Sequence, residues 1–350
     1  MNIIISAAKT GGHVYPAIEV GQELKSRGCK IFFIGTGSQI ELNALKDSGF
    51  EFIALNIDGF RGKSIFSKAA SIKNTFISIF KIIRIIKKND IKGIIGFGGF
   101  ITVPVGLAGY LMRIKVFTHE QNSVMGSANK LLSKFAFINF LGLPTNDDVK
   151  NSIESGNPIR PSFQKNKEVL QSNDEDIVKI YITGGSQGSS YINETLPLCL
   201  SEFKNKIKIK HQCGKGNVKE VEGLYSKTSL NYHVAEFYKD PSHEIDWADF
   251  VISRSGALTI SEVSSSSKGS LMIPLPISID NHQLINAQHI TNINMGCIHN
   301  ESDGPESLKK ILREIIDKKI YIEWQENKNS QHINASKVIS RNILKEYETI

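Results

Sequence analysis

The sequence predicts an α/β protein of two domains, each built around a parallel sheet. Short β-branched runs alternate with longer helical patterns through most of the 350 residues, an order typical of parallel strands joined by crossover helices. A polar stretch with two prolines and no apolar period interrupts this alternation, so we place the domain boundary near residues 157–175. The segments that begin at Asn2 and Val178 share the order strand, Thr-Gly-Gly turn and helix, which predicts two similar halves.

Each expected strand is a short apolar run followed by turn residues. In the first half these runs are NIIIS (2–6), KIFFIGTG (30–37), EFIALNI (51–57), IKGIIGFG (91–98) and KVFTHE (115–120). In the second half they are VKIYITGG (178–185), KIKHQCG (208–214), YHVAEF (232–237), DFVISRSG (249–256) and GSLMIPLP (269–276). We therefore expect an N-terminal domain over residues 1–160, a C-terminal domain over 161–334 and a final helix over 335–350.

The net charge of +7 is unevenly distributed along the chain. Residues 1–156 hold 19 Lys and Arg against 11 Asp and Glu, whereas the remaining residues hold 23 against 24. The densest basic part is 61–92, with nine basic residues and one acidic residue. A charge excess of this kind concerns binding partners rather than the fold.

The sequence predicts neither a metal site nor a disulfide framework. Its four cysteines lie far apart without a C-x-x-C pair, which favours a reducing cytosol. The sequence contains no H-E-x-x-H, and no D-x-D follows an expected strand. We expect a reaction without a metal, in which backbone N–H groups, helix dipoles and Arg or Lys stabilise the charge of the leaving group.

Two segments bear on membrane contact. Residues 93–112 lack charges over a length that could span a bilayer, but six glycines, Pro104 and the initial strand pattern favour a buried strand and turn. The helix expected over 72–88 is apolar on more than one face and is flanked by Lys and Arg. Such a helix is either a core helix with a solvated edge or one that also contacts lipid headgroups.

Three kinds of motif follow the expected strands and could bind a ligand. The Thr-Gly-Gly turns at Thr10 and Thr183 could present backbone N–H groups to an anion. Neither turn completes G-x-G-x-x-G and no P-loop motif occurs, so a nicotinamide dehydrogenase is weakly supported. The segments SRSGALTISE (253–262) and DNHQLINAQ (280–288) offer Glu262 and short amides for hydroxyl groups, and THEQNS (118–123) adds acid–base candidates.

These motifs together resemble the MurG family of bacterial glycosyltransferases. TGGHVYPA, GFRGK, GFGGF, HEQNSVMGSANK, GNPIR, TGGSQGSSYIN, RSGALTISE, IPLP and DNHQLINA occur in the family's order over nearly the whole chain. The resemblance implies a GT-B fold, in which two Rossmann-like domains face each other across a cleft and the last helix packs back on the first domain. It also implies inverting, metal-independent transfer of N-acetylglucosamine from UDP to lipid I, giving lipid II for peptidoglycan synthesis, with no cofactor.

The resemblance also implies the partners and the location. The partners are UDP-N-acetylglucosamine, the lipid I acceptor, an anionic membrane surface and possible other cell-wall synthesis proteins, with no nucleic acid. The expected location is peripheral, at the cytoplasmic face of the bacterial inner membrane. The residues that match the family's membrane-contact region are Ile79, Lys81, Ile83, Arg84, Lys87 and Lys88.

The resemblance assigns site residues position by position. His13 is the first candidate for the base that deprotonates the acceptor, and Glu120 is the second. The expected substrate contacts are Thr10, Gly11, Gly12, Asn122, Arg160, Ser186, Tyr238, Ala257, Leu258, Thr259, Ile260, Ser261, Glu262 and Gln283. Glu262 is expected to bind the ribose hydroxyls of UDP. The supporting residues are Asn129, Gly184, Gly185, Gly188, Asn193 and Arg254.

Four departures from the family pattern concern the acceptor side. Ala8 and Lys9 stand where the family has glycines, Phe100 replaces a tyrosine, and SSSSKGS (264–270) replaces an alanine-rich helix and a proline turn. Two other functions stay open: another GT-B enzyme such as a UDP-sugar epimerase, or a non-catalytic adaptor at a membrane surface. An epimerase would need neither a lipid acceptor nor the basic segment 61–92. An adaptor would bind its ligands without turnover.

Overall fold

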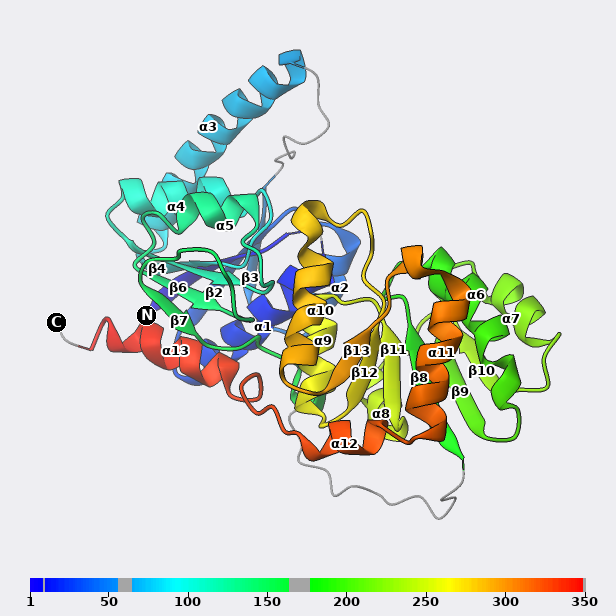
Figure 1. Cartoon of the computed structure of the whole chain (residues 1–350). Helices are drawn as coiled ribbons and strands as arrows, with labels where there is room; N and C mark the ends of the chain where they lie inside the picture. Colours follow the sequence, from blue (N-terminus) through cyan, green and yellow to red (C-terminus); the bar gives the residue numbers. More distant parts are fainter. Residues whose placement is uncertain (9, 56–64, 164–176, 349–350) are drawn as a thin grey trace. The chain divides into compact units, whose positions relative to one another are not determined.

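The chain forms two compact units, which are described separately (Figure 1). The computed structural model describes residues 1–8, 10–55, 65–163 and 177–348, with the side chains of helix α3 described from Asn74 onward. Unit 1 comprises Met1–Arg160 and Gln331–Ile350, and unit 2 comprises Pro161–Ser330. The expected motif GFRGK (59–63), the Lys9 departure and much of the polar boundary stretch lie outside the described residues.

Unit 1 contains a seven-stranded parallel sheet and the helices around it. Its strands are β1 (Asn2–Ser6), β2 (Lys30–Gly35), β3 (Glu51–Ala54), β4 (Ile91–Gly96), β5 (Lys115–Glu120), β6 (Ile138–Leu141) and β7 (Ser152–Glu154). Its helices are α1 (Gly11–Ser26), α2 (Gln39–Leu45), α3 (Ile65–Lys88), α4 (Thr102–Leu111), α5 (Ser127–Leu132) and α13 (Ala335–Lys345). The strand order is β3-β2-β1-β4-β5-β6-β7.

Alternate residues of β1 divide the core of unit 1 between the two faces of the sheet. Ile3 and Ile5 belong to a buried cluster with residues of α1 and with Ile339 and Ile343 of α13. Ile4 points to the opposite face and joins a cluster with residues of α3 and α4. This period of two places apolar side chains on both faces, as expected for a parallel strand covered by helices on each side. The last helix of the chain therefore packs within unit 1.

Unit 2 repeats the same plan with a six-stranded parallel sheet. Its strands are β8 (Val178–Thr183), β9 (Ile207–Gln212), β10 (Asn231–Ala235), β11 (Phe250–Ser253), β12 (Gly269–Met272) and β13 (Gly296–Ile298). Its α-helices are α6 (Ser190–Leu200), α7 (Val218–Tyr225), α8 (Pro241–Trp247), α9 (Ala257–Ser265), α10 (His282–Asn292), α11 (Gly304–Asp317) and α12 (Tyr321–Glu326). Four short 3₁₀ helices are η1 (Pro161–Phe163), η2 (Ser201–Phe203), η3 (Ile279–Asn281) and η4 (Glu301–Asp303).

The strand order of unit 2, β10-β9-β8-β11-β12-β13, matches the order of the first six strands of unit 1. The predicted fold class, two Rossmann-like domains with parallel sheets, is therefore confirmed. All ten strands expected from the sequence form, each within the expected run or one residue of it. The strands β6, β7 and β13 were not predicted.

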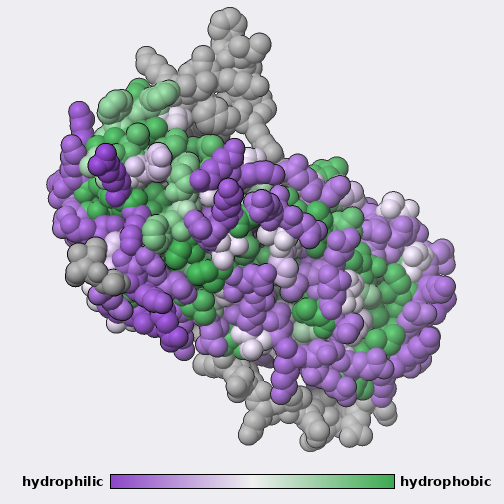
Figure 2. Space-filling model, turned by 60° about the vertical axis from the view of Figure 1, so that its left-hand side comes forward, coloured by the Kyte–Doolittle hydropathy of each residue, from purple (hydrophilic) through white to green (hydrophobic). Residues whose placement is uncertain are grey.

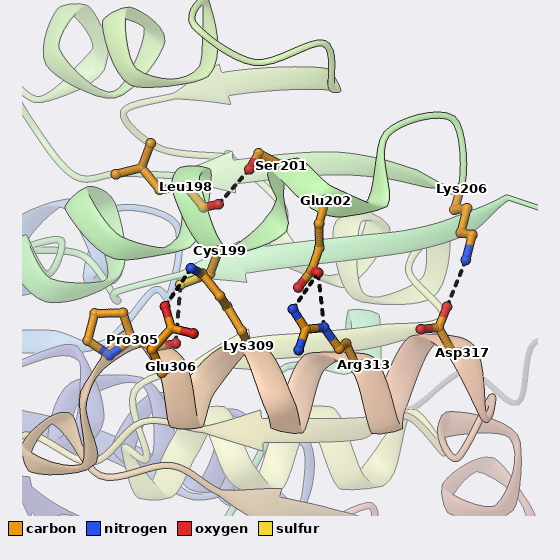
Figure 3. A network of polar contacts seen from close by, with 10 residues as sticks. All are labelled: Leu198, Cys199, Ser201, Glu202, Lys206, Pro305, Glu306, Lys309, Arg313 and Asp317. Carbon is orange, nitrogen blue, oxygen red and sulfur yellow. Dashed lines mark hydrogen bonds and ion pairs between the residues drawn. The ribbon is translucent and has the colours of Figure 1, made fainter.

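Helix α11 is fixed to α6 and η2 by a row of polar contacts (Figure 3). Arg313 of α11 donates two hydrogen bonds to Glu202 Oε2, at 2.9 and 2.7 Å, and Lys206 Nζ lies 2.9 Å from Asp317 Oδ1. The opposite side of α11 buries Leu308, Leu312, Ile315 and Ile316. Partly exposed ion pairs each contribute about 0.2–1 kcal/mol, so apolar burial holds this helix and the ion pairs set its position relative to η2 and the start of β9.

The charge-free segment 93–112 divides into the end of β4, a turn and the ten-residue helix α4. Among the residues that the structure describes, no helix combines the length and the apolar character that a bilayer span requires. Buried strand and helix packing thus account for the apolar character of this segment.

Helix α3 corrects part of the expected membrane contact. Ile79 is 7% exposed and packs in the core, so it presents no apolar surface, whereas Ile83 packs against the same cluster but is only half-buried. Phe76, Ile77 and Phe80 are the exposed apolar residues instead. The helical period explains the difference, since positions 79, 82 and 86 share the face toward the sheet whereas 76 and 80 lie together on another.

Candidate active site

The sequence motifs lie at the carboxyl ends of the strands, next to the topological switch point of each sheet. In unit 1, β1 pairs with β4 and β4 with β5, so the segments that follow these three strands meet at one edge. In unit 2, β8 pairs with β11 and β11 with β12, which brings three further motifs to one edge. Open α/β sheets bind ligands at this place.

His13 lies in the first turn of α1, with one ring nitrogen committed to the protein. Its Nδ1 is 3.0 Å from Thr10 Oγ1 and 3.4 Å from the carbonyl oxygen of Ala8. A carbonyl oxygen only accepts, so this environment favours the tautomer with the proton on Nδ1 and the lone pair on Nε2. Burial lowers the pKa of His13, although the charge of Glu120 and the Ala8 carbonyl act in the opposite direction. The ring is therefore neutral at pH 7, as a general base must be.

Two glycines of the segment GFGGF surround this histidine. A Cβ atom on Gly98 would lie 3.1 Å from His13 Nε2, and one on Gly99 would lie 3.3 Å from Ala8 Cβ. Both glycines have φ near +80 to +100°, a region that other residues rarely adopt. Ala8 is buried against Gly99, so its methyl group fills space in the core beside the turn. Phe100 packs partly buried against the cluster that includes α3 and α4.

Glu120 is 3% exposed and uses its carboxylate within the loop that follows β5. It accepts hydrogen bonds from Asn122 N and Nδ2, from Gly126 N and from Asn129 Nδ2, at 2.9–3.1 Å. Asn129 also donates to the carbonyl oxygen of His119. Four donors occupy most of the acceptor positions of a carboxylate. The geometry therefore favours His13 over Glu120 as the base, and gives Glu120, Asn122 and Asn129 the role of shaping the loop.

His119 is fully buried and has both ring nitrogens engaged. Its Nε2 lies 3.2 Å from the carbonyl oxygen of Gly156, and Gln121 Nε2 donates to its Nδ1 at 3.1 Å. Burial lowers the pKa of His119 to about 4, and its ring packs against Phe97 at a centroid distance of 5.2 Å. His119 thus connects β5 to the segment after β7 and is unsuited to proton transfer.

Arg160, the last residue of the first segment of unit 1, lies against α1. Its guanidinium carbon is 5.4 Å from the centroid of the Tyr15 ring, a distance suited to a cation–π contact. The Tyr15 ring covers Gly11, where a Cβ atom would lie 3.0 Å from the ring. Gly11, Tyr15 and Glu19 are spaced by four residues and share one face of the helix. The expected donor contacts Gly11 and Arg160 therefore both lie close to one aromatic ring.

Glu19 on this face gives a testable dependence of stability on pH. Burial raises its pKa to about 7, although Arg160 acts to lower it. The folded protein therefore keeps a proton on Glu19 that the unfolded chain releases near pH 4.5, and stability falls as the pH rises from there to about 7. Glu19→Gln removes this loss, so we expect the variant to be about 1–3 kcal/mol more stable than the unaltered protein at pH 8 and equally stable at pH 4.

Thermal denaturation at both pH values measures this difference. Glu23→Gln is the matched control, because Glu23 lies one turn further along α1 and pairs with Arg27. The control should show no gain at pH 8. Equal melting temperatures of Glu19→Gln and the unaltered protein at pH 8 would refute the raised pKa.

In unit 2, the glycines of the loop after β8 allow its backbone to lie close to neighbouring atoms. Gly185 N donates to Thr183 Oγ1 at 3.0 Å, and Gly185 and Gly188 have φ of +83° and +75°. A Cβ atom on Gly188 would lie 2.2 Å from the carbonyl oxygen of Cys213, and one on Gly184 would lie 2.5 Å from Ser189 N. Ser186 at the tip of the loop is exposed. The loop ends at the N-terminus of α6, where backbone N–H groups favour an anion.

Asn193 fixes this helix to the neighbouring strand. Its Nδ2 donates to the carbonyl oxygen of Cys213 at 2.9 Å, and its Oδ1 lies 3.2 Å from His211 Nε2. Both side chains are buried. Burial lowers the pKa of His211 to about 3, so the imidazole is neutral and can donate to Asn193. Asn193 thus supports the loop rather than contacting a ligand.

Helix α9 places the expected residues 257–262 on different faces. Leu258 and Thr259 are half-buried in the first turn, whereas Ile260 and Ser261 are fully buried. The Ser261 hydroxyl donates to the carbonyl oxygen of Ala257 at 2.8 Å. The side chains of Ile260 and Ser261 belong to the interior, so we expect the ligand contacts of this segment to come from other groups. The backbone N–H groups at the start of α9 and the 6% exposed Glu262 are the groups suited to a ligand.

Tyr238 follows β10 and is oriented by two contacts. Its hydroxyl lies 2.7 Å from His233 Nδ1, and its backbone N–H donates to Gln212 Oε1 at 3.1 Å. Burial raises the pKa of the Tyr238 hydroxyl, which is therefore protonated. The neighbouring Phe237 is 57% exposed, an unusual position for a large aromatic ring. Phe237 was not among the residues expected from the motifs, although the sequence places an aromatic pair directly after an expected strand.

Gln283 lies in the first turn of α10, after two residues in the left-handed region. Asp280 and Asn281 have φ of 52° and 53°, a conformation that Asp and Asn tolerate better than most residues. Gln283 Oε1 accepts from Leu275 N at 3.0 Å, so its amide NH₂ group is the part suited to a ligand. Arg254 follows β11 and donates from NH1 to the carbonyl oxygens of Ile273 and Pro274, both at 3.1 Å.

Comparison with known proteins identifies both units. Residues 3–137 match the glycosyltransferase family 28 N-terminal domain, and residues 179–343 match its C-terminal domain. The UDP-N-acetylglucosamine–N-acetylmuramyl-(pentapeptide) pyrophosphoryl-undecaprenol N-acetylglucosamine transferase of Buchnera aphidicola subsp. Baizongia pistaciae is 33% identical over 344 residues, 97% of each chain. The transferase of the same name from Psychrobacter cryohalolentis is 34% identical over 304 residues, 83% of each chain.

Solved structures agree with these relatives. The crystal structure of Acinetobacter baumannii MurG has a TM-score of 0.82 at 29% identity and covers 98% of this chain and 99% of its own. A UDP-GlcNAc 2-epimerase from Neisseria meningitidis bound to UDP-GlcNAc has a TM-score of 0.67 at 14% identity and covers 99% of this chain. At that identity, the likeness to the epimerase shows the fold alone.

Proposed function

Because the chain belongs to glycosyltransferase family 28, we propose that it transfers N-acetylglucosamine from UDP-N-acetylglucosamine to lipid I, giving lipid II for peptidoglycan synthesis. The protein is a glycosyltransferase of the GT-B fold. The observation that carries the proposal is the 33% identity with a transferase of this activity by name over 97% of both chains. The alternative of an epimerase has only the common fold in its favour.

On the acceptor side, the proposed chemistry rests on the orientation of His13. The 4-hydroxyl of the muramyl sugar attacks the anomeric carbon of N-acetylglucosamine, and the hydroxyl proton moves to His13 Nε2. Thr10 and the Ala8 carbonyl hold Nδ1, so the lone pair of Nε2 is directed away from the helix start. A positioned base of this kind contributes about 10²–10⁴-fold to the rate.

On the donor side, the bond from the anomeric carbon to the diphosphate breaks as UDP leaves. The loop 184–188 and the N-terminus of α6 would receive the negative charge that develops on UDP, together with the start of α9. Glu262 would accept hydrogen bonds from the ribose hydroxyls, and Tyr238 and Phe237 offer backbone and ring contacts for the uracil. Gln283 would bind a hydroxyl of the sugar, and Arg160 and the Thr10–Gly12 turn belong to the proposed donor contacts. The reaction needs no cofactor.

Glu120 has a different role in this proposal from the one expected of it. The four hydrogen bonds that it accepts make it a positioning residue for the loop 122–129. Its charge also acts on His13. Glu120 therefore supports the base rather than replacing it.

Acceptor-dependent release of UDP tests the proposed function. We would measure UDP release from UDP-N-acetylglucosamine with and without a lipid I analogue, in the presence of EDTA. Release that occurs only with the analogue supports transfer. Release that is independent of the acceptor would point to another UDP-sugar enzyme, and binding of both substrates without release would point to an adaptor.

We also propose that unit 1 contacts an anionic membrane surface from the cytoplasmic side, as a peripheral protein. Its exposed apolar side chains include Phe76, Ile77 and Phe80 on α3 and Tyr110 and Leu111 at the end of α4, a helix packed against α3. Figure 2 shows apolar surface on unit 1. Exposed apolar groups next to basic residues are typical of surfaces that bind the interface of a bilayer.

The exposed basic residues of α3 make this contact testable. Replacing Lys81, Arg84, Lys87 and Lys88 with Gln removes four positive charges that lie on the surface. Each contributes about 1 kcal/mol near an anionic surface, so we expect binding to vesicles that contain anionic lipid to fall by at least 100-fold at low salt. The loss should shrink as salt is raised. Vesicle sedimentation measures it.

A matched variant separates this effect from net charge. Lys204, Lys215, Lys219 and Lys227 are equally exposed and lie in unit 2, so their replacement by Gln changes the total charge by the same amount. This control should retain most of the vesicle binding. Equal losses of vesicle binding in the two variants would show that overall charge explains the effect and that α3 does not contact the membrane.

A further inference from the structure

A chain of polar contacts crosses the carboxyl ends of the strands of unit 2, with Arg254 at its centre. Arg254 NH1 lies 2.5 Å from Glu301 Oε1, and the two side chains are only 13% and 22% exposed. The same nitrogen donates to the carbonyl oxygens of Ile273 and Pro274. Arg254 thus joins the segment after β11 to the segment after β12 and to η4. Ion pairs that are largely removed from water hold their geometry more firmly than exposed pairs.

The segment after β12 leads directly to Gln283. Leu275 follows the two carbonyl groups that Arg254 binds, and its N–H donates to Gln283 Oε1 at 3.0 Å. Asn286, one turn further along α10, donates from Nδ2 to the carbonyl oxygen of Ser255, next to Arg254. The position of the Gln283 amide therefore depends on the backbone that Arg254 holds.

Glu301 is itself held on a rigid support. His299, two residues earlier, is fully buried, and its Nε2 lies 2.8 Å from the Tyr191 hydroxyl of α6. Asn300 and Asp303 form a reciprocal capping box around Glu301. Helix α11 starts directly after η4, and Cys199 Sγ of α6 lies 3.7 Å from the carbonyl oxygen of Pro305 in the first turn of α11 (Figure 3). Glu301 therefore occupies a fixed place relative to α6, the helix that follows the loop 184–188.

We propose that Glu301 is a positioning residue for sugar recognition, which acts through Arg254 and the 273–275 segment to fix the amide of Gln283. This inference rests on the proposed function, because it takes the ligand of Gln283 to be the sugar of a UDP-sugar. It assigns to Glu301 a selective role: the residue affects the sugar end of the donor and leaves the recognition of UDP unchanged. No substrate atom touches Glu301 in this scheme.

The experiment compares the affinities for UDP and for UDP-N-acetylglucosamine by calorimetry, in the full chain. We expect Glu301→Ala to weaken binding of UDP-N-acetylglucosamine by about tenfold and binding of UDP by less than about twofold. The contact with Arg254 is an ion pair, so Glu301→Gln, which keeps the size of the side chain but removes its charge, should recover little of the loss. Unchanged UDP binding also shows that unit 2 is folded in each variant.

Glu202→Ala is the matched control. Glu202 of η2 pairs with Arg313 in the middle of α11, away from η4 and from the contacts that position Glu301. This variant should leave the ratio of the two affinities unchanged. The same change of ratio in Glu202→Ala would show that α11 as a whole, and not Glu301, sets the sugar affinity.

A double mutant tests the route through Gln283. If Glu301 acts through that amide, Glu301→Ala should add less than about twofold to the loss already caused by Gln283→Ala. Additive losses of affinity in the double mutant would contradict this route. Equal losses of affinity for UDP and UDP-N-acetylglucosamine in Glu301→Ala would also contradict it, as would no loss of affinity for either ligand. If the unaltered protein bound neither ligand, the proposed function would fail, and the role of Glu301 with it.

Discussion

His13→Asn is expected to lower kcat for transfer by about 10²–10⁴-fold while the affinity for UDP-N-acetylglucosamine stays within about twofold. The asparagine keeps an amide donor near the Ala8 carbonyl, so the start of α1 retains its contact, but no lone pair remains at the position of Nε2. Single-turnover kinetics with a lipid I analogue and calorimetry with UDP-N-acetylglucosamine separate the two effects.

The pH profile gives a second measure of the same role. Burial lowers the pKa of His13, and a base acts only when it is neutral, so activity should persist at pH 6.5 and fall at lower pH as the imidazole gains a proton. The variant should lack this acid limb. His243→Asn is the control, because His243 is exposed on α8, and it should behave as the unaltered protein does. If His13→Asn retained the full kcat, His13 would not be the base.

Glu262→Ala is expected to weaken UDP binding by about 100-fold or more. Hydrogen bonds to a charged group contribute about 1.5–3 kcal/mol each, and two ribose hydroxyls would lose their acceptor. Turnover at saturating donor should fall much less, since the ribose does not change during the reaction. Calorimetric titration with UDP and steady-state kinetics test both expectations.

Glu314→Ala controls for the loss of a carboxylate from unit 2. Glu314 lies on the exposed side of α11 and pairs weakly with Lys318 at 3.8 Å. It should leave UDP binding unchanged. Because Glu262 is 6% exposed, melting temperatures of both variants are needed as well. A Glu262→Ala protein that melts normally and binds UDP normally would remove this residue from the nucleotide site.

The strands that the sequence predicted are those with a strong local signal. NIIIS and KVFTHE are apolar runs that end at glycines or polar motifs, and both form strands. Strand β6 lies inside FAFINFLGL, where apolar residues extend beyond the four paired residues on both sides. Strands β7 and β13 have three residues each and lie at sheet edges, where pairing with one neighbour decides the structure. Tertiary pairing therefore accounts for the misses.

The candidate site also has parts with a strong local signal in the sequence and parts that depend on tertiary contacts. The turns at Thr10 and Thr183 were visible because glycine and threonine mark a break between strand and helix. The contact of Tyr15 with Arg160 and that of Arg254 with Glu301 were not visible, because they join residues far apart in the sequence. The family resemblance supplied Arg160 and Arg254 but not the side chains that hold them. Helix α3 shows the same limit, since its composition indicated a basic apolar helix but not which isoleucines face the sheet.

The return of the chain to unit 1 has a consequence for folding during synthesis. Ile339 and Ile343 of α13 complete a buried cluster whose other members lie in the first 140 residues. Unit 2, by contrast, is encoded without interruption between Pro161 and Ser330. Domains generally fold as they emerge from the ribosome. The second unit can therefore form before α13 has emerged to complete the buried cluster of the first, so we expect the N-terminal unit to be the last to finish folding.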